Sequence, residues 1–136
     1  MYIDERKNLF RNPRGSSNPY FIMAILLVVV ALIAVVRAKS EAQVPPLAEA
    51  LIEGGLTCIE VTTTTPNFLG AIRATRARIG NRGLVGVGTI LDVVNCQAAL
   101  DAGAEFVVSP ISRTELVPVC HAAGKPVMLG AYTPSE

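Results

Sequence analysis

The sequence predicts an α/β protein with a parallel β-sheet, and two observations support this prediction. Helix-like segments that end in glycine are repeatedly followed by an apolar run, and this unit recurs about every 21 to 26 residues, as a strand–loop–helix module would. The apolar runs show no polar alternation, which is typical of parallel strands covered by helices. Such βα units close most naturally into a (β/α)8 TIM barrel, and we expect one truncated after about five strands. An open, doubly wound sheet is the alternative.

The first two units show the pattern. A valine-rich run predicts a first strand over 28–37, and the helix predicted after it, 40–54, ends in glycine. Glycine is common at this position because it adopts the left-handed conformation that ends many helices. The run 58–62 then predicts the second strand, since it is rich in β-branched residues.

The following units repeat the order of helix, glycine and apolar run. They predict strands over 84–89, 106–109 and 126–131 and helices over 66–79, 91–102 and 112–123. At the end of the chain, Thr133 and Glu136 have the spacing of a capping box, which predicts the first turn of another helix.

The N-terminal residues separate into two parts. Residues 1–20 are polar and rich in Pro and Gly, which predicts a disordered segment ahead of a partial barrel domain over 21–136. The uncharged apolar run 21–36 follows several basic residues and permits two interpretations. It is either a short membrane anchor or a buried helix that leads into the first strand. We favour the second, because the barrel needs a strand there.

Composition excludes several classes of function. The formal net charge of the 136 residues is +1, and acidic and basic residues are mixed along the chain. The protein therefore has no strong positive electrostatic field that would attract nucleic acid. The three cysteines, Cys58, Cys96 and Cys120, are too far apart for a CxxC metal site or a disulfide framework. We therefore expect no metal, and reduced thiols in a cytoplasmic protein.

Glu60 is a carboxylate inside the predicted apolar strand 58–62. An ionised carboxylate does not enter a protein core unless it is paired, hydrogen-bonded or functional. In a central strand, Glu60 is a candidate general acid or base at the C-terminal end of a barrel strand. At a sheet edge it would face water and have no such role. Predicted helices on both sides of the strand favour the central position.

The C-terminal ends of barrel strands are where active sites form, and the residues predicted there suit a small anionic substrate. They are Arg37, Glu60, Thr62 to Thr65, Gly86 to Thr89, Ser109, Pro110, Gly130 and Thr133. This set offers a base, a cation, hydroxyl groups and glycines that let a ligand approach the backbone. The GxG at 86–88 lacks the rest of a dinucleotide fingerprint.

Taken together, five segments resemble the class I aldolases of the 2-keto-3-deoxy-6-phosphogluconate (KDPG) and 4-hydroxy-2-oxoglutarate (KHG) type. They are Ala34 to Ala38, Ile59 to Thr62, Val85 to Thr89, Phe106 to Pro110 and Gly124 to Glu136. Their order and spacing make the match specific, and it covers roughly residues 28–136, as an N-terminal fragment of the family's chain would.

The resemblance implies a TIM-barrel lyase, usually a homotrimer, that splits a 2-keto-3-deoxy sugar acid phosphate into pyruvate and glyceraldehyde 3-phosphate. In this family a lysine forms a Schiff base with the keto carbon. The iminium then accepts the electrons of the broken carbon–carbon bond, and no metal or organic cofactor takes part.

The resemblance also implies roles for four residues of this sequence. The family's glutamate transfers protons and corresponds to Glu60. Its threonine after the glycine pair helps hold the substrate carboxylate and corresponds to Thr89. The proline that lines the pocket corresponds to Pro110. Arg37 matches an arginine that is common after the first strand, where a contact to an anion is expected.

The sequence departs from the family pattern at two places. Some members have an arginine at the position of Thr64, which leaves the preferred substrate open. The family's Schiff-base lysine lies on the sixth strand, beyond residue 136. A nucleophilic lysine must be desolvated or lie near a cation, whereas Lys39 is expected to be exposed and Lys125 lies at the opposite end of its strand. We therefore expect no aldolase activity from these 136 residues alone.

Two other functions stay open. A catalytically dead, truncated barrel would act as a small-anion binding or assembly module, and a membrane-tethered protein would use residues 21–36 as its anchor. Five strands of a barrel also leave open edges and uncovered apolar surface, so we expect the fragment to dissolve poorly or to self-associate.

Overall fold

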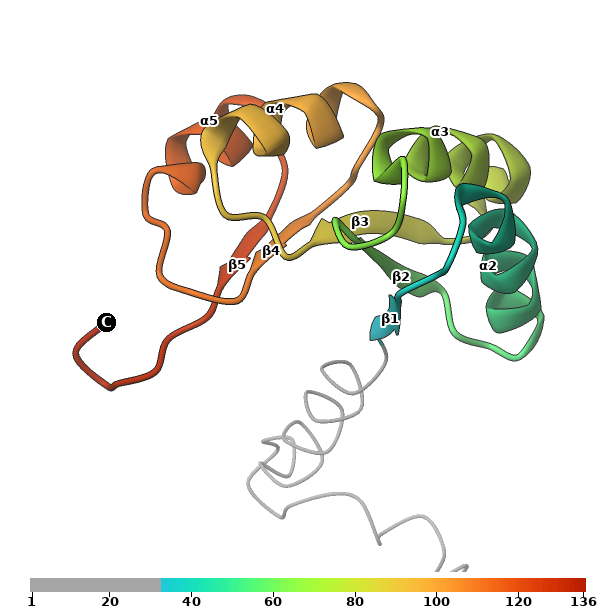
Figure 1. Ribbon diagram of the computed structural model, residues 1–136, viewed down its shortest axis with the longest axis horizontal. Coiled ribbons are helices and arrows are strands. Elements are labelled where there is room, and N and C mark those ends of the chain that lie inside the picture. The colour runs from blue at the N-terminus through green and yellow to red at the C-terminus, as the bar shows by residue number, and fades with distance from the viewer. Residues whose placement is uncertain (1–32) are drawn as a thin grey trace, which may run out of the picture. The chain divides into compact units, whose positions relative to one another are not determined.

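Strands and helices alternate along residues 33–136, the part of the chain that the computed structural model describes (Figure 1). The strands are β1 (Ile33–Val36), β2 (Cys58–Thr62), β3 (Leu84–Gly88), β4 (Val107–Ser109) and β5 (Val127–Leu129). The helices are α2 (Val44–Glu53), α3 (Phe68–Ile79), α4 (Val93–Asp101) and α5 (Leu116–Ala122), with short 3-10 turns η2 (Glu41–Gln43) and η3 (Gly80–Arg82). The predicted alternation of strand and helix is confirmed here.

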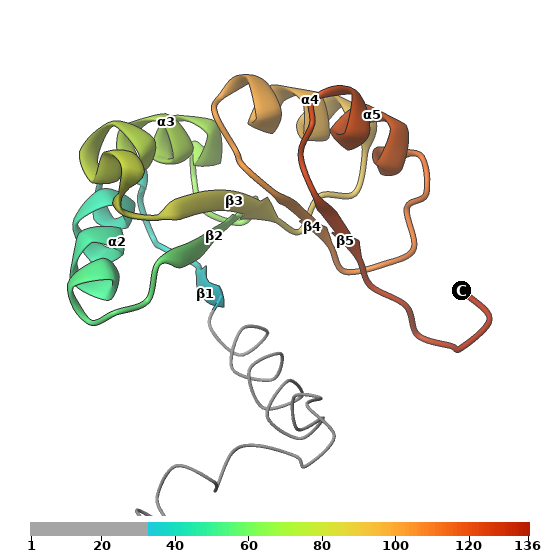
Figure 2. The same cartoon turned by 180° about the vertical axis from the view of Figure 1, so that it is seen from behind.

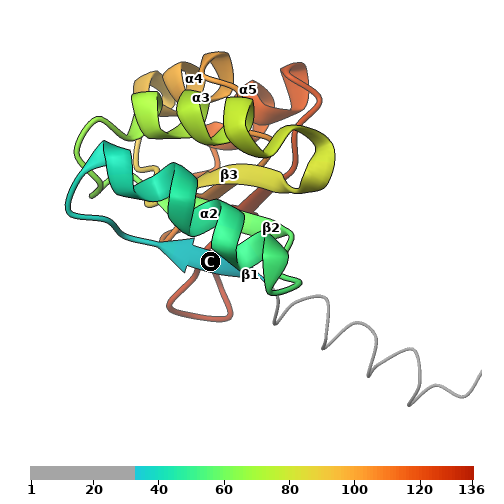
Figure 3. The ribbon, with the colours of Figure 1, turned by 90° about the vertical axis from the view of Figure 1, so that its right-hand side faces the viewer.

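All neighbouring strands are parallel, and their order is β1-β2-β3-β4-β5. The sheet is curved, and the helices lie along one of its faces, as Figures 2 and 3 show from two further sides. Sequential strand order with helices on one face is the arrangement of a (β/α)8 barrel. A doubly wound sheet reverses its strand order and carries helices on both faces. The barrel prediction is therefore confirmed over five strands, and the doubly wound alternative is wrong.

The helix-covered face of the sheet holds the core. Successive residues of a strand point to opposite faces, and the register pairs Ile59 with Val85 and Val61 with Val87. These four side chains are fully buried and belong to one apolar cluster with Ile72 of α3. The apolar runs that predicted the strands thus supply the contacts between sheet and helices.

The other face of the sheet carries exposed apolar side chains. Val35, Leu84 and Met128 are 61%, 50% and 41% exposed. In a complete barrel this face lines the packed interior, so their exposure is the uncovered apolar surface expected of five strands. Glu60 lies on the same face, since it pairs in register with Val35 and Gly86.

Helix starts differ from the predicted ones where local geometry delays the helix. α2 begins at Val44 instead of residue 40 because turn η2 precedes it. α3 begins at Phe68 instead of residue 66, since Asn67 has a positive φ of 49° that is incompatible with a helix. α5 begins at Leu116 instead of residue 112, after a turn in which the amide of Leu116 donates to the carbonyl of Arg113. The observed strands β3, β4 and β5 lie within two residues of their predicted bounds.

Three predictions fall on residues 1–32, which lie outside the described residues. They are the disordered segment 1–20, the apolar helix that begins at residue 21 and the first part of the strand predicted over 28–37. Within residues 33–136, no helix has the length and apolar character needed to cross a membrane.

Glu105 joins the N-terminal ends of β3 and β4. Its Oε2 accepts hydrogen bonds from the Val85 amide at 3.0 Å and from Nη1 of Arg76 at 2.7 Å, and both side chains of this ion pair are mostly buried. We expect Glu105→Ala to lower the free energy of unfolding by about 1–3 kcal/mol, because the Val85 amide loses its acceptor and Arg76 loses its carboxylate partner.

Urea unfolding of the two variants Glu105→Ala and Glu115→Ala measures this effect. Glu115 forms an exposed ion pair with Arg113 at 3.3 Å, and exposed pairs contribute only about 0–1 kcal/mol. Equal losses of stability in the two variants would contradict the role given to Glu105.

Cys96 on α4 and Cys120 on α5 are buried, and their Sγ atoms lie 3.6 Å apart. Burial, with a contribution from the Cys120 thiol, raises the pKa of Cys96 to about 12. Because the thiolate is the reactive form, we expect Ellman's reagent to modify the half-buried Cys58 first and the other two thiols only on unfolding. Titration with and without urea tests this order, and rapid reaction of every thiol in the folded protein would contradict it.

Candidate active site

The C-terminal ends of β1, β2 and β3 bring three candidate residues to one edge of the sheet. Arg37 directly follows β1, Glu60 lies two residues before the end of β2, and Thr89 directly follows β3. Because these strands are adjacent and parallel, their C-terminal ends meet at the same edge. The structure therefore places a carboxylate between a guanidinium and a hydroxyl, one from each neighbouring strand end.

Glu60 lies in a central strand and is nearly buried. β2 pairs with β1 on one side and β3 on the other, so the alternative that Glu60 lies at a sheet edge is wrong. Its exposed fraction is 8%, and burial raises the pKa of its carboxyl group. A carboxyl group with a raised pKa holds its proton more readily and can both accept and return one during a reaction.

Two glycines of β3 leave room for side chains on this face. A Cβ added at Gly88 would lie 1.6 Å from Oε1 of Glu60, so the carboxylate lies directly against the backbone of β3. A Cβ added at Gly86 would lie 2.3 Å from the ring of Phe106. The sequence interpretation assigned this space to a ligand and missed Phe106 as a wall of the site. The sequence signal for this crowded face was the two-residue spacing of Gly86 and Gly88, which puts both glycines on the face of the sheet that carries Glu60.

The last residue of β2 and the loop after it, Thr62 to Thr65, form what we call the threonine brace. On the β1 side, Nε of Arg37 donates to Thr64 Oγ1 at 3.0 Å, and the hydroxyls of Thr64 and Thr62 lie 2.8 Å apart. Thr62 Oγ1 donates its hydrogen to the carbonyl of Val36 at 3.3 Å, so Thr64 must be the donor to Thr62. The relay runs in one direction from guanidinium to backbone carbonyl and ties Arg37 to the loop.

On the β3 side, the brace holds a strained residue. Thr63 Oγ1 donates to the carbonyl of Thr89 at 3.0 Å, and the Thr63 amide donates to the carbonyl of Gly88 at 3.0 Å. Thr89 has a φ of 64°, a left-handed conformation that is unusual for a β-branched residue. Such strain costs about 1–3 kcal/mol and is common at functional sites. The residue after Thr89, Ile90, is fully buried and is held in place by a hydrogen bond from its amide to the carbonyl of Val108 at 3.2 Å.

Pro110 lies at the end of β4, apart from the other three candidates. The amide of Gly130, which follows β5, donates to the carbonyl of Ser109 at 2.8 Å. A Cβ added at Gly130 would lie 2.3 Å from the carbonyl oxygen of Pro110. The segment that follows β5 therefore packs closely against Pro110. Pro110 lies at the C-terminal edge of the sheet, one strand further along than Thr89.

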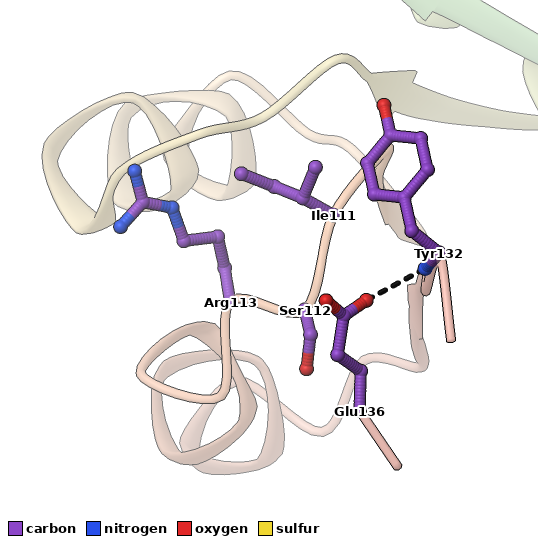
Figure 4. Close-up of a pocket in the computed structure, with 5 residues that line it drawn as sticks. All are labelled: Ile111, Ser112, Arg113, Tyr132 and Glu136. Atoms are coloured by element: carbon purple, nitrogen blue, oxygen red, sulfur yellow. Dashed lines mark hydrogen bonds between the residues drawn. The ribbon is translucent and has the colours of Figure 1, made fainter. Parts of the chain in front are cut away.

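A hollow of about 430 Å³ lies between the loops that follow β4 and β5 (Figure 4). The residues that line it are Ile111, Ser112, Arg113, Tyr132 and Glu136. The Glu136 carboxylate accepts a hydrogen bond from the Tyr132 amide at 2.6 Å, and Arg113 pairs with Glu115. Both charged groups of the hollow therefore already have partners, and Glu60 is not among the lining residues.

The described strand ends offer acid–base chemistry and anion binding. Glu60 supplies a carboxyl group with a raised pKa, and Arg37 and Thr89 supply a cation and a hydroxyl. Within residues 33–136, no group of three His, Cys, Asp or Glu side chains could hold a metal ion. Of the lysines in this range, Lys39 is exposed and Lys125 lies before β5, at the N-terminal edge of the sheet.

Fold and site together define part of a (β/α)8 barrel with a nearly buried carboxyl group of raised pKa toward the C-terminal ends of its strands. The family model "KDPG and KHG aldolase" matches residues 24–136. The chain belongs to this aldolase family.

Individual relatives agree with the family match. A 2-dehydro-3-deoxy-phosphogluconate aldolase of Treponema pallidum is 40% identical over 107 residues, which are 79% of this chain and 50% of the relative. One from Pseudomonas aeruginosa is 39% identical over 103 residues, 75% of this chain and 46% of the relative. The chain thus spans about half the length of the curated relatives it matches.

Solved structures show the same fold. The KDPG aldolase of Legionella pneumophila, captured with pyruvate as a covalent carbinolamine intermediate, has a TM-score of 0.70 at 31% identity, over 76% of this chain and 50% of that chain. The KDPG aldolase of Zymomonas mobilis has a TM-score of 0.69 at 33% identity, over 76% of this chain and 49% of that chain.

Proposed function

We propose that the full-length form of this protein is a Schiff-base aldolase that cleaves a 2-keto-3-deoxy sugar acid phosphate into pyruvate and glyceraldehyde 3-phosphate. The observation that carries the proposal is Glu60, a nearly buried carboxyl group with a raised pKa in a barrel strand of an aldolase-family chain. Its position suits a group that moves protons next to a keto acid held at the strand ends.

The proposed reaction gives Glu60 two proton transfers. A lysine amine condenses with the substrate ketone and releases water, which yields an iminium. Glu60 takes the proton of the hydroxyl on the aldehyde-forming carbon, the carbon–carbon bond breaks, and its electron pair moves to the iminium to give an enamine. Glu60 then returns the proton to the enamine carbon, and water hydrolyses the new iminium to pyruvate and free lysine. Acid–base help of this kind contributes about 10²- to 10⁴-fold in rate.

The other candidate residues bind the substrate in this proposal. Thr89 and Arg37 hold its anionic groups on either side of Glu60, and Pro110 lines the pocket at β4. The reacting lysine belongs on a sixth strand, as the family resemblance implies. The exposure of Lys39 and the placement of Lys125 at the N-terminal edge of the sheet are consistent with this assignment.

We also propose that the full-length form is a homotrimer in the cytoplasm. Support for association comes from a structural neighbour, a cage designed by fusing symmetric oligomeric domains, which matches this chain with a TM-score of 0.72 at 25% identity. The buried, reduced thiols of Cys96 and Cys120 suit a reducing compartment.

Borohydride trapping tests the proposed function. The longest product of the gene is incubated with pyruvate and sodium borohydride, and intact mass and peptide mapping follow. We expect one reduced pyruvate on a lysine downstream of residue 136, with no adduct on Lys39 or Lys125. An unmodified protein would contradict the proposed aldolase activity. It would support the alternative of a catalytically dead anion-binding or assembly module.

A further inference from the structure

The threonine brace connects the strand ends that flank Glu60. Thr64 holds the guanidinium of Arg37 on the β1 side, and Thr63 holds the carbonyl of Thr89 on the β3 side. The two contacts come from consecutive residues of one loop and point to opposite neighbours. The brace therefore fixes the separation of the two proposed anion contacts relative to the carboxylate between them.

The strain at Thr89 indicates that this separation matters. A β-branched residue does not adopt a φ of 64° unless its surroundings hold it there. Two hydrogen bonds from Thr63 help to hold it: the Thr63 hydroxyl donates to the carbonyl of Thr89, and the Thr63 amide donates to the carbonyl of the preceding residue, Gly88. Among residues 33–136, no hydrogen bond holds the side-chain hydroxyl of Thr89 itself, which leaves that group for a ligand.

We propose that Thr63 and Thr64 are positioning residues, which set Thr89 and Arg37 at the spacing of an anionic keto acid across Glu60. This inference rests on the proposed function, because it needs Thr89 and Arg37 to bind the substrate. Thr63 acts through the backbone of Thr89, and Thr64 acts through Nε of Arg37. Neither hydroxyl needs to touch the substrate, since each already has a protein partner.

The test replaces each hydroxyl by a methyl group of the same shape. Thr63→Val is expected to weaken pyruvate binding by the longest gene product about threefold to tenfold, the loss that corresponds to one neutral hydrogen bond. Thr63→Ser, which keeps the hydroxyl, is expected to restore the affinity. Thr64→Val is expected to weaken binding by a similar factor.

Thr75→Val is the matched control. Its Oγ1 is buried on α3 and has no hydrogen-bond partner among residues 33–136, so the same substitution there is expected to leave pyruvate affinity unchanged. A second readout on the 136-residue chain is independent of the ligand. We expect the carbon chemical shifts of Thr89 to change in Thr63→Val and the Nε–H signal of Arg37 to change in Thr64→Val.

The outcomes separate the two claims. Wild-type pyruvate affinity and unchanged Thr89 and Arg37 signals in both valine variants would overturn the positioning role while leaving the proposed function intact. A wild-type protein that binds no pyruvate would count against the proposed function, whatever the variants show. Weakened binding in Thr63→Val that serine restores, with no effect of Thr75→Val, supports the positioning role.

Discussion

Replacing Gly88 with alanine is expected to lower the proposed lyase activity of the full-length form by about 10²-fold, because displacing a reacting group by about 1 Å can cost that much. A Cβ at this position would lie 1.6 Å from Oε1 and 2.4 Å from Cδ of Glu60, so the carboxylate must move. The fold should survive, since the displaced atoms are the end of a flexible side chain. Steady-state kinetics and thermal unfolding of the variant measure both effects.

Gly54→Ala is the control for this substitution. A Cβ there would lie 3.3 Å from the carbonyl oxygen of Leu51, which requires only a small adjustment, and Gly54 lies at the end of α2. We expect its activity to match that of the wild type. Unchanged activity in Gly88→Ala would show that the position of Glu60 against β3 has no part in catalysis.

Removing the charge of Glu60 is expected to abolish most activity and to change how stability depends on pH. Glu60→Gln should lower the rate by about 10²- to 10⁴-fold if the carboxyl group transfers the protons.

Burial raises the pKa of Glu60 above its ordinary value of 4.5. Its contribution to folding is therefore fully present below pH 4.5 and is lost as pH rises through the folded-state pKa. The glutamine variant lacks this loss and should be relatively more stable at neutral pH.

Urea unfolding from about pH 4 to 8, across the ordinary range of carboxyl titration, measures this dependence. Glu49→Gln is a control of opposite sign, because hydrogen bonds from Arg82 and Arg78 lower the pKa of Glu49. Its stabilising contribution is present above the ordinary pKa and is lost as pH falls through the lowered one. The same pH dependence in Glu60→Gln and wild type would contradict the burial of a titrating carboxyl group.

The prediction of the fold depended on local signals. Glycine at the ends of helical segments and unbroken apolar runs gave the order of elements, and these signals do not require knowledge of the rest of the chain. Helix starts were less predictable. The left-handed Asn67 delays α3 and the turn before Leu116 delays α5, and both depend on how the loop closes onto the sheet.

The site was predictable only in part. Glu60 stands out because a carboxylate in an apolar run needs a reason to be there. The bond between Thr63 and Thr89 could not be predicted, since the two residues are 26 positions apart and meet only because β2 and β3 are in register. Phe106 was missed for the same reason, because its ring meets Gly86 only through the pairing of β4 with its neighbour β3. Contacts between strand ends arise from register, which the linear pattern does not encode.

Exchange of the pyruvate methyl protons in D2O measures proton transfer by Glu60, because returning a proton to the enamine carbon is the step assigned to this residue. The longest gene product is incubated with pyruvate in D2O, and the loss of the methyl signal is followed by proton NMR, for the wild type and for Glu60→Gln. We predict exchange in the wild type and a rate lower by about 10²-fold or more in the variant. A wild type that exchanges no protons would contradict the proposed aldolase activity, and a variant that exchanges them at the wild-type rate would contradict proton transfer by Glu60.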